Sequence, residues 1–535
     1  MDQFAAKFPR LQTHATDGGK PTKQRWGRLM TGIDRRTVLK AGALAALSGP
    51  FAAALTRPTP VSASPLIAPW TAAGSDPAVV GSWSEPFDMG GIAIHAALTH
   101  VGDVLFFGDI GDQAGSPELY VGTWNYATGA VGQAPLGYDR DLFCAGLNVL
   151  ADGRVFVAGG HLHPSDAERT PENWPTGVAD TDTYDPVARR WTSGPDLSEA
   201  RWYPTSLTMP DNTVLIFGGQ VGMGTPSDTV DMYDPAANTV TRLPASATRP
   251  VGLYPRMHLM PNGDVLKSGP PRTSAYFSRS TNAWTNSASM TFGARVRGHS
   301  VLLPGATRVL HVGGQSDGGT PPTGTAEVLD TSAKAPKWTA TGSLNHPRIL
   351  GNTVVLPDGK VIIIGGGAQF KYKGPVYIPE LWDPANGRWI ELPPHQASRM
   401  YHSVALLLPD GRVLSAGQDF GPLETTGEIY SPPYLFKGPR PTIASAPSEA
   451  GYGQQLSIST PEAADIASVV LIRPGCLTHQ IDTDQRSLPL KFTAGSGMIT
   501  AQTPPNAQTA PPGYYMLFIL NSVGVPSVAP WVHLG

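Results

Sequence analysis

The sequence predicts an all-β protein, because a short hairpin motif recurs along it, turn-forming residues are abundant and charged residues are scarce. The chain has 535 residues, of which 60 are glycine and 53 are proline, so about a fifth of it favours turns. Charged residues make up 15%, below the roughly 25% of an average soluble protein. This length exceeds one domain of ordinary size, so we expect several domains or a repeat architecture.

Residues 1–63 are expected to be a twin-arginine export signal with an N-terminal extension. Arg35 and Arg36 precede a short apolar run, and a small-residue segment follows that would be cleaved near Ala63. The apolar run is interrupted by a serine and a proline and is too short to span a bilayer, which disfavours a membrane anchor. The mature protein is expected in the periplasm, in the cell envelope or outside the cell, as a monomer without a transmembrane span.

The charge of the mature chain disfavours nucleic acid as a partner. Without residues 1–63, 29 Lys and Arg stand against 39 Asp and Glu, which gives a formal charge of −10. A nucleic-acid-binding surface would instead be basic.

Residues 64–435 are predicted to form a seven-bladed β-propeller of kelch type. A strand–turn–strand motif occurs seven times, as VGDVLFFGD, ADGRVFVAGG, PDNTVLIFGG, PNGDVLKSG, PGATRVLHVGG, PDGKVIIIGGG and PDGRVLSAG. Further strand-like motifs such as TYDPVARRW and LWDPANGRW lie between the copies, so each unit is expected to contain four short strands. A period of about 50 residues is typical of propeller blades, and a closed ring leaves no long free edge.

Residues 436–535 are predicted to form an immunoglobulin-like β-sandwich. A proline-rich linker, KGPRPTIASAP, follows the last repeat, and short alternating runs such as QLSIST, ASVVLIRP and YYMLFILNS then stand between Gly/Pro turns.

One position of each blade is expected to face the central channel. Counting back eight residues from the turn residue before glycine gives Cys144, Tyr203 and His402 in three blades, with Tyr401 one position earlier, and Tyr254 in a fourth blade. The first strand of a blade lines the channel, so equal offsets place these side chains at one height. An error in strand register would displace any one of them.

Each of these residues alone also has an ordinary structural explanation. Tyrosine rings pack, a histidine can be a satisfied polar residue, and a free cysteine behaves as a small hydrophobic residue. Their shared offset favours a common site. Imidazole nitrogen and phenolate oxygen suit Cu(II), whereas zinc would recruit more cysteine or carboxylate. A phenol, with an ordinary pKa of about 10, binds as phenolate only where a cation replaces its proton.

These motifs resemble those of the galactose oxidase and glyoxal oxidase family, the copper radical oxidases. The resemblance covers nearly the whole mature chain and includes FCAGLNVLADGRVFVAGG, ARWYPTSLTMPDNTVLIFGG, YHSVALLLPDGRVLSAG, LIRPGCLTHQIDTDQRSLPL and APPGYYMLFILNSVGVPSVAP. It implies a thioether between Cys144 and the ring of Tyr203, which makes a one-electron redox cofactor. It also implies that Tyr203, His402 and His479 are equatorial copper ligands and that Tyr401 is the axial ligand.

The activity that the resemblance implies is oxidation of a small aldehyde, as its hydrate, or of a primary alcohol. The two electrons would be shared between copper and a radical on Tyr203, with Tyr401 as general base, and dioxygen would leave as hydrogen peroxide. The chain resembles glyoxal oxidases and their bacterial relatives more closely than galactose oxidase, because it shows no N-terminal carbohydrate-binding module.

The two cysteines allow two interpretations. For an exported protein, one disulfide between Cys144 and Cys476 is the simple expectation. The resemblance instead joins Cys144 to Tyr203 and leaves Cys476 as a free thiol.

One feature departs from the family. Galactose oxidase has a tryptophan stacked on its thioether, in the loop after the second strand of the tyrosine blade, but here that loop, GGQVGMGTPSDTV, contains none. Trp174 and Trp202 are the candidates to replace it. Three further residues are candidates either for lining the substrate pocket or for holding blades together, namely Tyr254, Arg256 and Arg297.

Two other functions are compatible with a propeller. A non-catalytic kelch propeller that binds carbohydrate or protein at the cell envelope would need no set of redox-capable side chains. A glycosidase would need paired carboxylates near the axis, but no Asp or Glu occupies the eight-residue offset in the blades that align. His161 and His163 are expected to lie in a solvated loop.

Overall fold

The computed structural model describes residues 76–109, 119–138, 140–161, 176–222, 224–316, 320–369, 373–419 and 422–535. Within it, Trp70–Gly535 form one compact unit. The predicted export signal, residues 1–63, lies outside the described residues, as do Trp174 and His163.

The described residues are almost entirely strands and loops. Their helices are short, namely α1 (Pro77–Val80) and the 3-10 helices η3 (Ala245–Ala247), η4 (Pro433–Phe436) and η5 (Ala463–Asp465). No helix in this part of the chain has the length and apolar character that crossing a membrane requires. The prediction of an all-β chain is confirmed.

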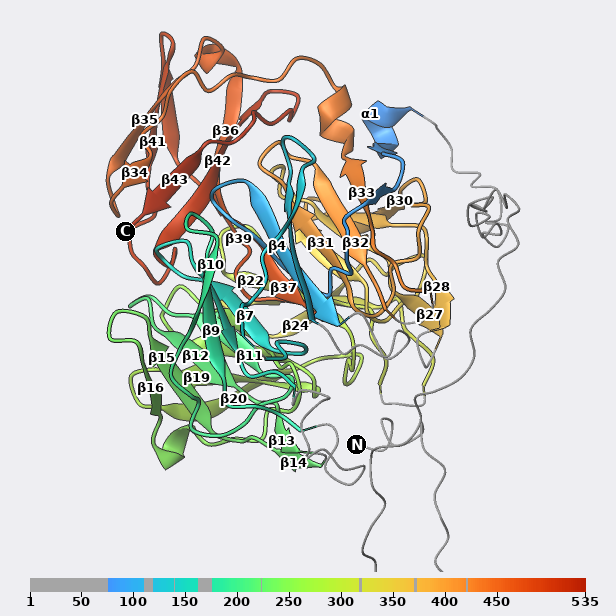
Figure 1. Cartoon of the computed structure of the whole chain (residues 1–535). Coiled ribbons are helices and arrows are strands. Elements are labelled where there is room, and N and C mark those ends of the chain that lie inside the picture. The colour runs from blue at the N-terminus through green and yellow to red at the C-terminus, as the bar shows by residue number, and fades with distance from the viewer. Residues whose placement is uncertain are drawn as a thin grey trace, which may run out of the picture. The chain divides into compact units, whose positions relative to one another are not determined.

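Seven antiparallel sheets of four or more strands are found between residues 82 and 431 of the described chain (Figure 1). Their main strands are, sheet by sheet, β3 (His95–Leu98), β4 (Asp103–Asp109), β5 (Leu119–Asn125) and β6 (Val131–Gln133); β7 (Gly146–Val149), β8 (Val155–Ala158), β9 (Thr181–Asp185) and β10 (Arg190–Ser193); β11 (Thr205–Thr208), β12 (Val214–Phe217), β15 (Val230–Asp234) and β16 (Thr239–Arg242); β17 (Arg256–Leu259), β18 (Val265–Gly269), β19 (Thr273–Ser278) and β20 (Ala283–Ser289); β21 (His299–Leu302), β22 (Arg308–Val312), β23 (Ala326–Asp330) and β24 (Trp338–Thr341); β25 (Asn352–Val355), β26 (Val361–Ile364), β29 (Glu380–Asp383) and β30 (Arg388–Glu391); β31 (Ser403–Leu407), β32 (Val413–Gly417) and β33 (Thr426–Ser431). Two small hairpins accompany them, β13 (Gln220–Gly222) with β14 (Thr225–Pro226) and β27 (Gly367–Gln369) with β28 (Lys373–Pro375).

The recurring sequence motif forms the first hairpin of each sheet. Gly153 and Gly411 show why its turn contains glycine, because their φ angles of 84° and 79° lie in the region that glycine adopts most easily. The strands on either side are buried, as in β8 and β12, which explains their continuous apolar sequences.

First strands of successive sheets lie side by side. Contacts join β7 to β11 and β11 to β17, and they join β21 to β25, β25 to β31 and β31 to β3. Between β17 and β21, the Nε2 atom of His258 lies 2.7 Å from the Oγ atom of Ser300. The N-terminal strands β1 (Ser82–Trp83) and β2 (Phe87–Asp88) both pair with β33 and complete the seventh sheet.

A buried ion pair recurs in four of these sheets. An arginine four residues before the first strand contacts an acidic residue on the third main strand of the same sheet; the pairs are Arg201–Asp231 (3.0 Å), Arg295–Glu327 (3.1 Å), Arg348–Glu380 (2.7 Å) and Arg399–Glu428 (2.9 Å). Each arginine also donates to the carbonyl of a glycine near the end of the second strand. The pairs therefore fix the start of a sheet to its interior.

The C-terminal region forms two sheets that share a core. One contains β34 (Glu449–Ala450), β43 (Trp531–Leu534), β42 (Gly513–Asn521), β36 (Ile466–Arg473) and β39 (Arg486–Pro489), and the other contains β35 (Gln455–Ser459), β41 (Met498–Gln502) and β40 (Phe492–Gly495). Ile458 of one sheet and Val469 and Leu517 of the other belong to the same buried cluster. Packing of two antiparallel-rich sheets around one core is typical of β-sandwiches.

A hairpin from this C-terminal region extends the first sheet. Strand β37 (Cys476–Thr478) pairs with β3, and β38 (Ile481–Asp482) pairs with β37. Figure 1 shows the red β37 near the blue strands of the first sheet, in which β3 lies between β37 and β4. Strand β37 also contacts β7, so the hairpin reaches the place where the first and second sheets meet.

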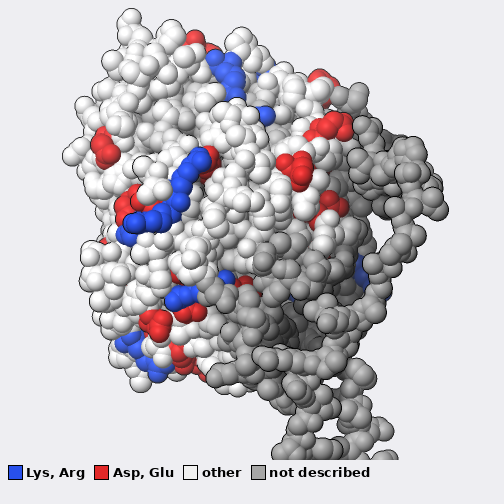
Figure 2. Space-filling view, viewed as in Figure 1, with Lys and Arg blue, Asp and Glu red and all other residues white. Residues whose placement is uncertain are grey.

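Charged side chains are sparse on the face shown in Figure 2. On this face, both signs are scattered over the described residues and do not gather into one patch.

Candidate metal centre

Six sheets begin in the same unusual backbone conformation. The residue eight positions before the hairpin turn has a positive φ in each, and we call these the entry residues: Cys144 (64°), Tyr203 (65°), Tyr254 (42°), Arg297 (57°), Leu350 (61°) and His402 (67°). Such φ values are uncommon for residues other than glycine. Neighbouring entry residues are hydrogen bonded, since the N–H of Tyr203 donates to the carbonyl of Cys144 (3.1 Å) and the N–H of Tyr254 donates to that of Tyr203 (2.8 Å). The offset found in the sequence thus corresponds to one backbone geometry.

Cys144 and Tyr203 are neighbours in space. Their side chains pack in one buried cluster with Trp202, Tyr254 and Ile481, and the residues are 0% and 6% exposed. Adjacent sheets supply the two residues, and the hydrogen bond between their backbones holds the two strand entries together. The sulfur of Cys144 is therefore not remote from the Tyr203 ring.

Tyr401 and His402 are consecutive in the sequence, and both side chains contact the group that contains Cys144 and Tyr203. The hydroxyl groups of Tyr203 and Tyr401 form a hydrogen bond, and the Tyr401 ring stacks on the His402 ring with centroids 3.7 Å apart. In an extended strand, consecutive side chains point to opposite faces. The left-handed backbone of His402 breaks this alternation, so both side chains contribute to one cluster.

His479 lies in the turn of the β37–β38 hairpin. This two-residue turn consists of His479 and Gln480, whose φ values are 49° and 66°; positive φ at both positions defines a type I′ turn. The turn brings the His479 ring to 4.3 Å from the His402 ring, between centroids. Its Nε2 atom lies 3.5 Å from the sulfur of Cys144.

These side chains fit a copper ion. The donor atoms of Cys144, His402 and His479 lie within 4.8 Å of one another, and all three residues are buried. The rings of Tyr203 and Tyr401 lie 4.8 and 5.4 Å from the His479 ring. Two imidazoles and two phenols match the nitrogen and oxygen ligands that suit Cu(II).

Both histidines are oriented through their Nδ1 atoms. The Nδ1 atom of His402 lies 2.6 Å from the Oδ1 atom of Asp419, and the Nδ1 atom of His479 lies 2.5 Å from the Oγ1 atom of Thr478. This contact engages Nδ1 of His402, so its Nε2 atom can be presented to a metal.

Burial disfavours the charged forms of Tyr203, Cys144 and His479. It raises the pKa of the Tyr203 hydroxyl well above its ordinary value, with the charges of Cys144 and Tyr401 acting in the same direction. Burial also raises the pKa of the Cys144 thiol and lowers the pKa of His479, with His402 and His95 adding to that effect. Only a bound cation would stabilise phenolates in such a place.

The three additional pocket candidates have different surroundings. The Tyr254 ring lies 4.7 Å from the His479 ring, so it borders the cluster. Arg256 is buried, and its guanidinium donates to the carbonyls of Tyr254 (2.8 Å) and Gly298 (2.9 Å). Arg256 therefore connects neighbouring sheets. Arg297 is half-buried.

The structure corrects the prediction for His161. This residue is buried, 3.6 Å from a carboxylate oxygen of Asp141, with ring centroids 6.0 Å from Phe143 and 6.3 Å from Trp202. It does not lie in a solvated loop, because these neighbours cover it. Trp202 itself meets Tyr203 edge to face, with centroids 4.0 Å apart and planes at 71°, so it does not stack on that ring.

Sequence reasoning missed His95 and Asp419. His95 is fully buried on β3, and its Nε2 atom accepts the backbone N–H of Cys144 at 3.0 Å. The eight-residue offset gives Ala93 in that sheet, so it offered no signal for His95. Asp419 follows the seventh hairpin by two residues, and the GQD sequence there was the one available signal.

Neither cysteine forms a disulfide. Cys476 lies on β37 opposite Ala97 of β3 and packs in a buried cluster with Leu105 and Phe107. The disulfide interpretation is thus wrong, and Cys476 is a free thiol.

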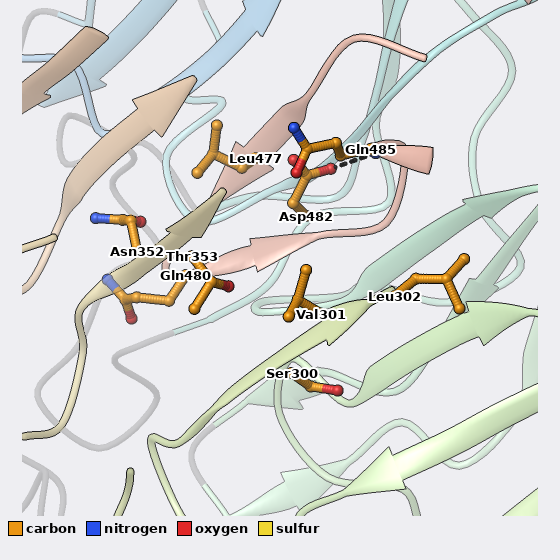
Figure 3. Close-up of a pocket in the computed structure, with 9 residues that line it drawn as sticks. All are labelled: Ser300, Val301, Leu302, Asn352, Thr353, Leu477, Gln480, Asp482 and Gln485. Carbon is orange, nitrogen blue, oxygen red and sulfur yellow. Dashed lines mark hydrogen bonds between the residues drawn. The ribbon is translucent and has the colours of Figure 1, made fainter. Parts of the chain in front are cut away.

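A separate small pocket is lined in part by Gln480, the second residue of the β37–β38 turn (Figure 3). Its lining consists of Ser300, Val301, Leu302, Asn352, Thr353, Leu477, Gln480, Asp482 and Gln485. The amide atoms of Gln480 and the Oδ1 atom of Asn352 have no hydrogen-bond partner among the described residues. The pocket contains none of the five predicted site residues, so it is distinct from the candidate metal centre.

Comparisons with known proteins agree with this geometry. Residues 120–423 match the family model "Glyoxal oxidase N-terminus", and residues 440–534 match "Galactose oxidase-like, Early set domain". A galactose oxidase of Gibberella zeae is 30% identical over 497 residues, which cover 85% of this chain and 71% of that protein. An aldehyde oxidase of Vitis pseudoreticulata is 30% identical over 451 residues, covering 75% and 83%.

A solved structure is also similar. It is a fungal alcohol oxidase of the AA5 family in complex with copper, with a TM-score of 0.75 and 27% identity, and the match covers 85% of this chain and 99% of that chain.

Proposed function

Because the chain belongs to the family of galactose oxidases and glyoxal oxidases, we propose that it is a copper radical oxidase that oxidises small aldehydes or primary alcohols and reduces dioxygen to hydrogen peroxide. The observation that carries this proposal is the convergence of Cys144, Tyr203, Tyr401, His402 and His479 in one buried cluster. A propeller that only binds a ligand would have no need of such a set.

The proposed scaffold is a seven-bladed propeller, residues 64–435, followed by a β-sandwich, residues 436–535. Its support is the succession of seven sheets and the side-by-side first strands. Pairing of β1 and β2, from the start of this segment, with β33, from its end, supports closure of such a ring. We also propose that residues 1–63 direct export by the twin-arginine pathway, as their sequence predicts.

The proposed copper ligands are Tyr203, Tyr401, His402 and His479, which would together hold the ion. A copper ion held there would supply one-electron redox exchange and polarisation of the substrate oxygen. Asp419 and Thr478 support this assignment, because they engage the Nδ1 atoms and leave both Nε2 atoms for the metal.

The remaining catalytic roles are assigned to side chains of this chain. Cys144 and Tyr203 would be joined in a thioether and would supply one-electron chemistry toward the substrate carbon. Tyr401 is the general base for the substrate hydroxyl, and its hydroxyl group already meets that of Tyr203. Burial of the cluster excludes bulk water from these side chains.

The substrate class follows from what the relatives' substrates have in common. A primary alcohol and an aldehyde hydrate both present a carbon that carries a hydroxyl group and a hydrogen atom. One hydroxyl proton and one C–H hydrogen are what Tyr401 and the thioether would remove, so both classes suit one site.

The test is copper loading followed by a screen for peroxide release. Purified protein loaded with Cu(II) in air should release hydrogen peroxide with at least some small aldehydes or primary alcohols, and Cys144→Ala should lose this activity. Equal activity of Cys144→Ala would rule out the radical mechanism. A protein that binds no copper would instead favour the non-catalytic kelch propeller that binds carbohydrate or protein.

A further inference from the structure

We propose that His95 is a positioning residue for formation of the thioether, because its imidazole holds the backbone of Cys144 in the conformation that directs the sulfur to Tyr203. This inference rests on the proposed function, which requires the thioether.

The contact itself fixes the state of His95. Its Nε2 atom lies 3.0 Å from the backbone nitrogen of Cys144, and a backbone N–H can only donate. Nε2 is therefore the unprotonated nitrogen, and the neutral ring carries its proton on Nδ1. His95 thus acts as a hydrogen-bond acceptor for the strand entry that carries the cysteine.

His95 is rigidly held, so it can impose a position on its partner. It is 0% exposed and lies on β3, which is paired on both sides, to β4 and to β37. Its ring stacks on Phe107 with centroids 4.4 Å apart and planes 9° apart. In the strand register, His95 stands opposite Thr478, the neighbour of His479. One residue therefore links the cysteine to the hairpin that brings the histidine.

Comparison with the other entry residues shows what His95 replaces. The backbone N–H groups of Tyr203, Tyr254 and Leu350 each donate to the carbonyl of the entry residue in the preceding sheet, at 3.1, 2.8 and 3.1 Å. The sheet before Cys144 has no such residue, since Ala93, at the same offset, has no positive φ, and β37 lies against both β3 and β7.

The imidazole of His95 therefore provides to Cys144 the acceptor that a backbone carbonyl provides to Tyr203, Tyr254 and Leu350. Without it, the buried N–H of Cys144 would lack a partner, at a residue whose φ of 64° is already unfavourable. The backbone would then relax, and the sulfur would meet the Tyr203 ring less often.

The affected step can be followed by mass. Formation of the thioether breaks the S–H bond of Cys144 and one C–H bond of the Tyr203 ring and makes one C–S bond. Two protons and two electrons pass to dioxygen, which becomes hydrogen peroxide, so the chain loses two hydrogen atoms. Intact mass and tyrosine-containing peptides therefore report the extent of reaction without any substrate turnover.

The experiment compares two side chains of similar length. Copper is added to the reduced, uncrosslinked protein without oxygen, air is admitted, and the half-time of the mass loss is measured. His95→Met, which lacks a strong acceptor, should crosslink about tenfold more slowly or worse. His95→Gln, whose Oε1 can replace Nε2, should react within a few-fold of the native protein. If His95→Met does not fold, His95→Phe serves in its place, because its ring can still stack on Phe107.

His299→Met is the matched control. The Nε2 atom of His299 also accepts a backbone N–H, that of Gly351 at 3.2 Å, and the residue is equally buried. We expect this variant to lose stability but to crosslink at the native rate. Native-rate crosslinking by His95→Met, or equal slowing by His299→Met, would overturn the inference. A native protein that never loses two hydrogens would instead contradict the proposed function.

Discussion

Entry residues of different sheets have the same backbone conformation and different chemistry. Cys144, Tyr203 and His402 contribute side chains to the candidate metal centre, whereas Arg297 and Leu350 offer no side chain that suits Cu(II), although all five have φ between 57° and 67°. Backbone strain of this kind is often read as a sign of function. Here it accompanies the start of a sheet, and function depends on which side chain occupies the position.

The comparison also explains how the site can be rigid. Backbone hydrogen bonds join three neighbouring pairs of entry residues, and four of the sheets carry a buried ion pair just before the entry. A scaffold built for sheet-to-sheet contact therefore positions the ligands as well.

The largest expected effect comes from removing the imidazole of one entry residue, His402. His402→Ala should lower Cu(II) affinity by about a thousandfold or more, because each ligand contributes on the order of 3–4 kcal/mol to a four-ligand site. Arg297→Ala, at the same backbone position in another sheet, should leave the affinity within a few-fold of native. Chelator competition measures both. A similar loss in the two variants would mean that backbone geometry, and not the imidazole, determines binding.

Removing one partner of a buried ion pair should instead lower the free energy of unfolding. In Arg348→Met, the buried carboxylate of Glu380, 0% exposed like its partner, loses its counter-charge, and the free energy of unfolding should fall by roughly 3–5 kcal/mol. The double variant Arg348→Met/Glu380→Gln should recover part of this loss. Denaturant unfolding is the measurement, and a single variant as stable as the double variant would argue against a role for the charge pair.

A smaller effect is expected from Asp419, which contacts the Nδ1 atom of His402. Asp419→Asn removes the carboxylate from His402 and should weaken Cu(II) binding about 10- to 100-fold, with altered EPR parameters for the bound metal. Asp358→Asn is a suitable control, because that turn carboxylate pairs with Lys360 away from the cluster. Unchanged EPR parameters in Asp419→Asn would show that the carboxylate does not tune His402.

The smallest effect concerns acid stability. Burial, followed by the charges of Arg256 and Arg348, lowers the pKa of His299 from 6.5 to about 3. Above pH 6.5 the residue is neutral in both folded and unfolded chains, so it adds no pH dependence. As pH falls toward 3, the unfolded chain binds a proton that the folded chain does not, and stability is lost.

Between pH 7.5 and 5.5 this residue should account for about 1.4 kcal/mol of that loss. His299→Gln should therefore show a smaller decrease in unfolding free energy over the same interval. An identical decrease in both proteins would show that His299 is not responsible.

The sequence by itself determined what is local to a repeat. Turn glycines and apolar runs predicted the first hairpin of each sheet, and the distance from turn to strand entry predicted that Cys144, Tyr203 and His402 occupy equivalent positions. Both follow from backbone geometry over fewer than a dozen residues, which residue spacing encodes directly. The number of blades remains a prediction from the repeat count, and the roles of the site residues remain proposals.

Only the tertiary structure decided which distant residues meet. His479 could be named from family resemblance but not from any offset, because its place depends on a hairpin from the C-terminal region pairing with β3. The roles of His95 and Asp419 were still harder to predict from the sequence. Each role depends on a contact with another residue in space, His95 with Cys144 and Asp419 with His402. Strand pairing across hundreds of residues sets these contacts, and no periodicity in the chain records it.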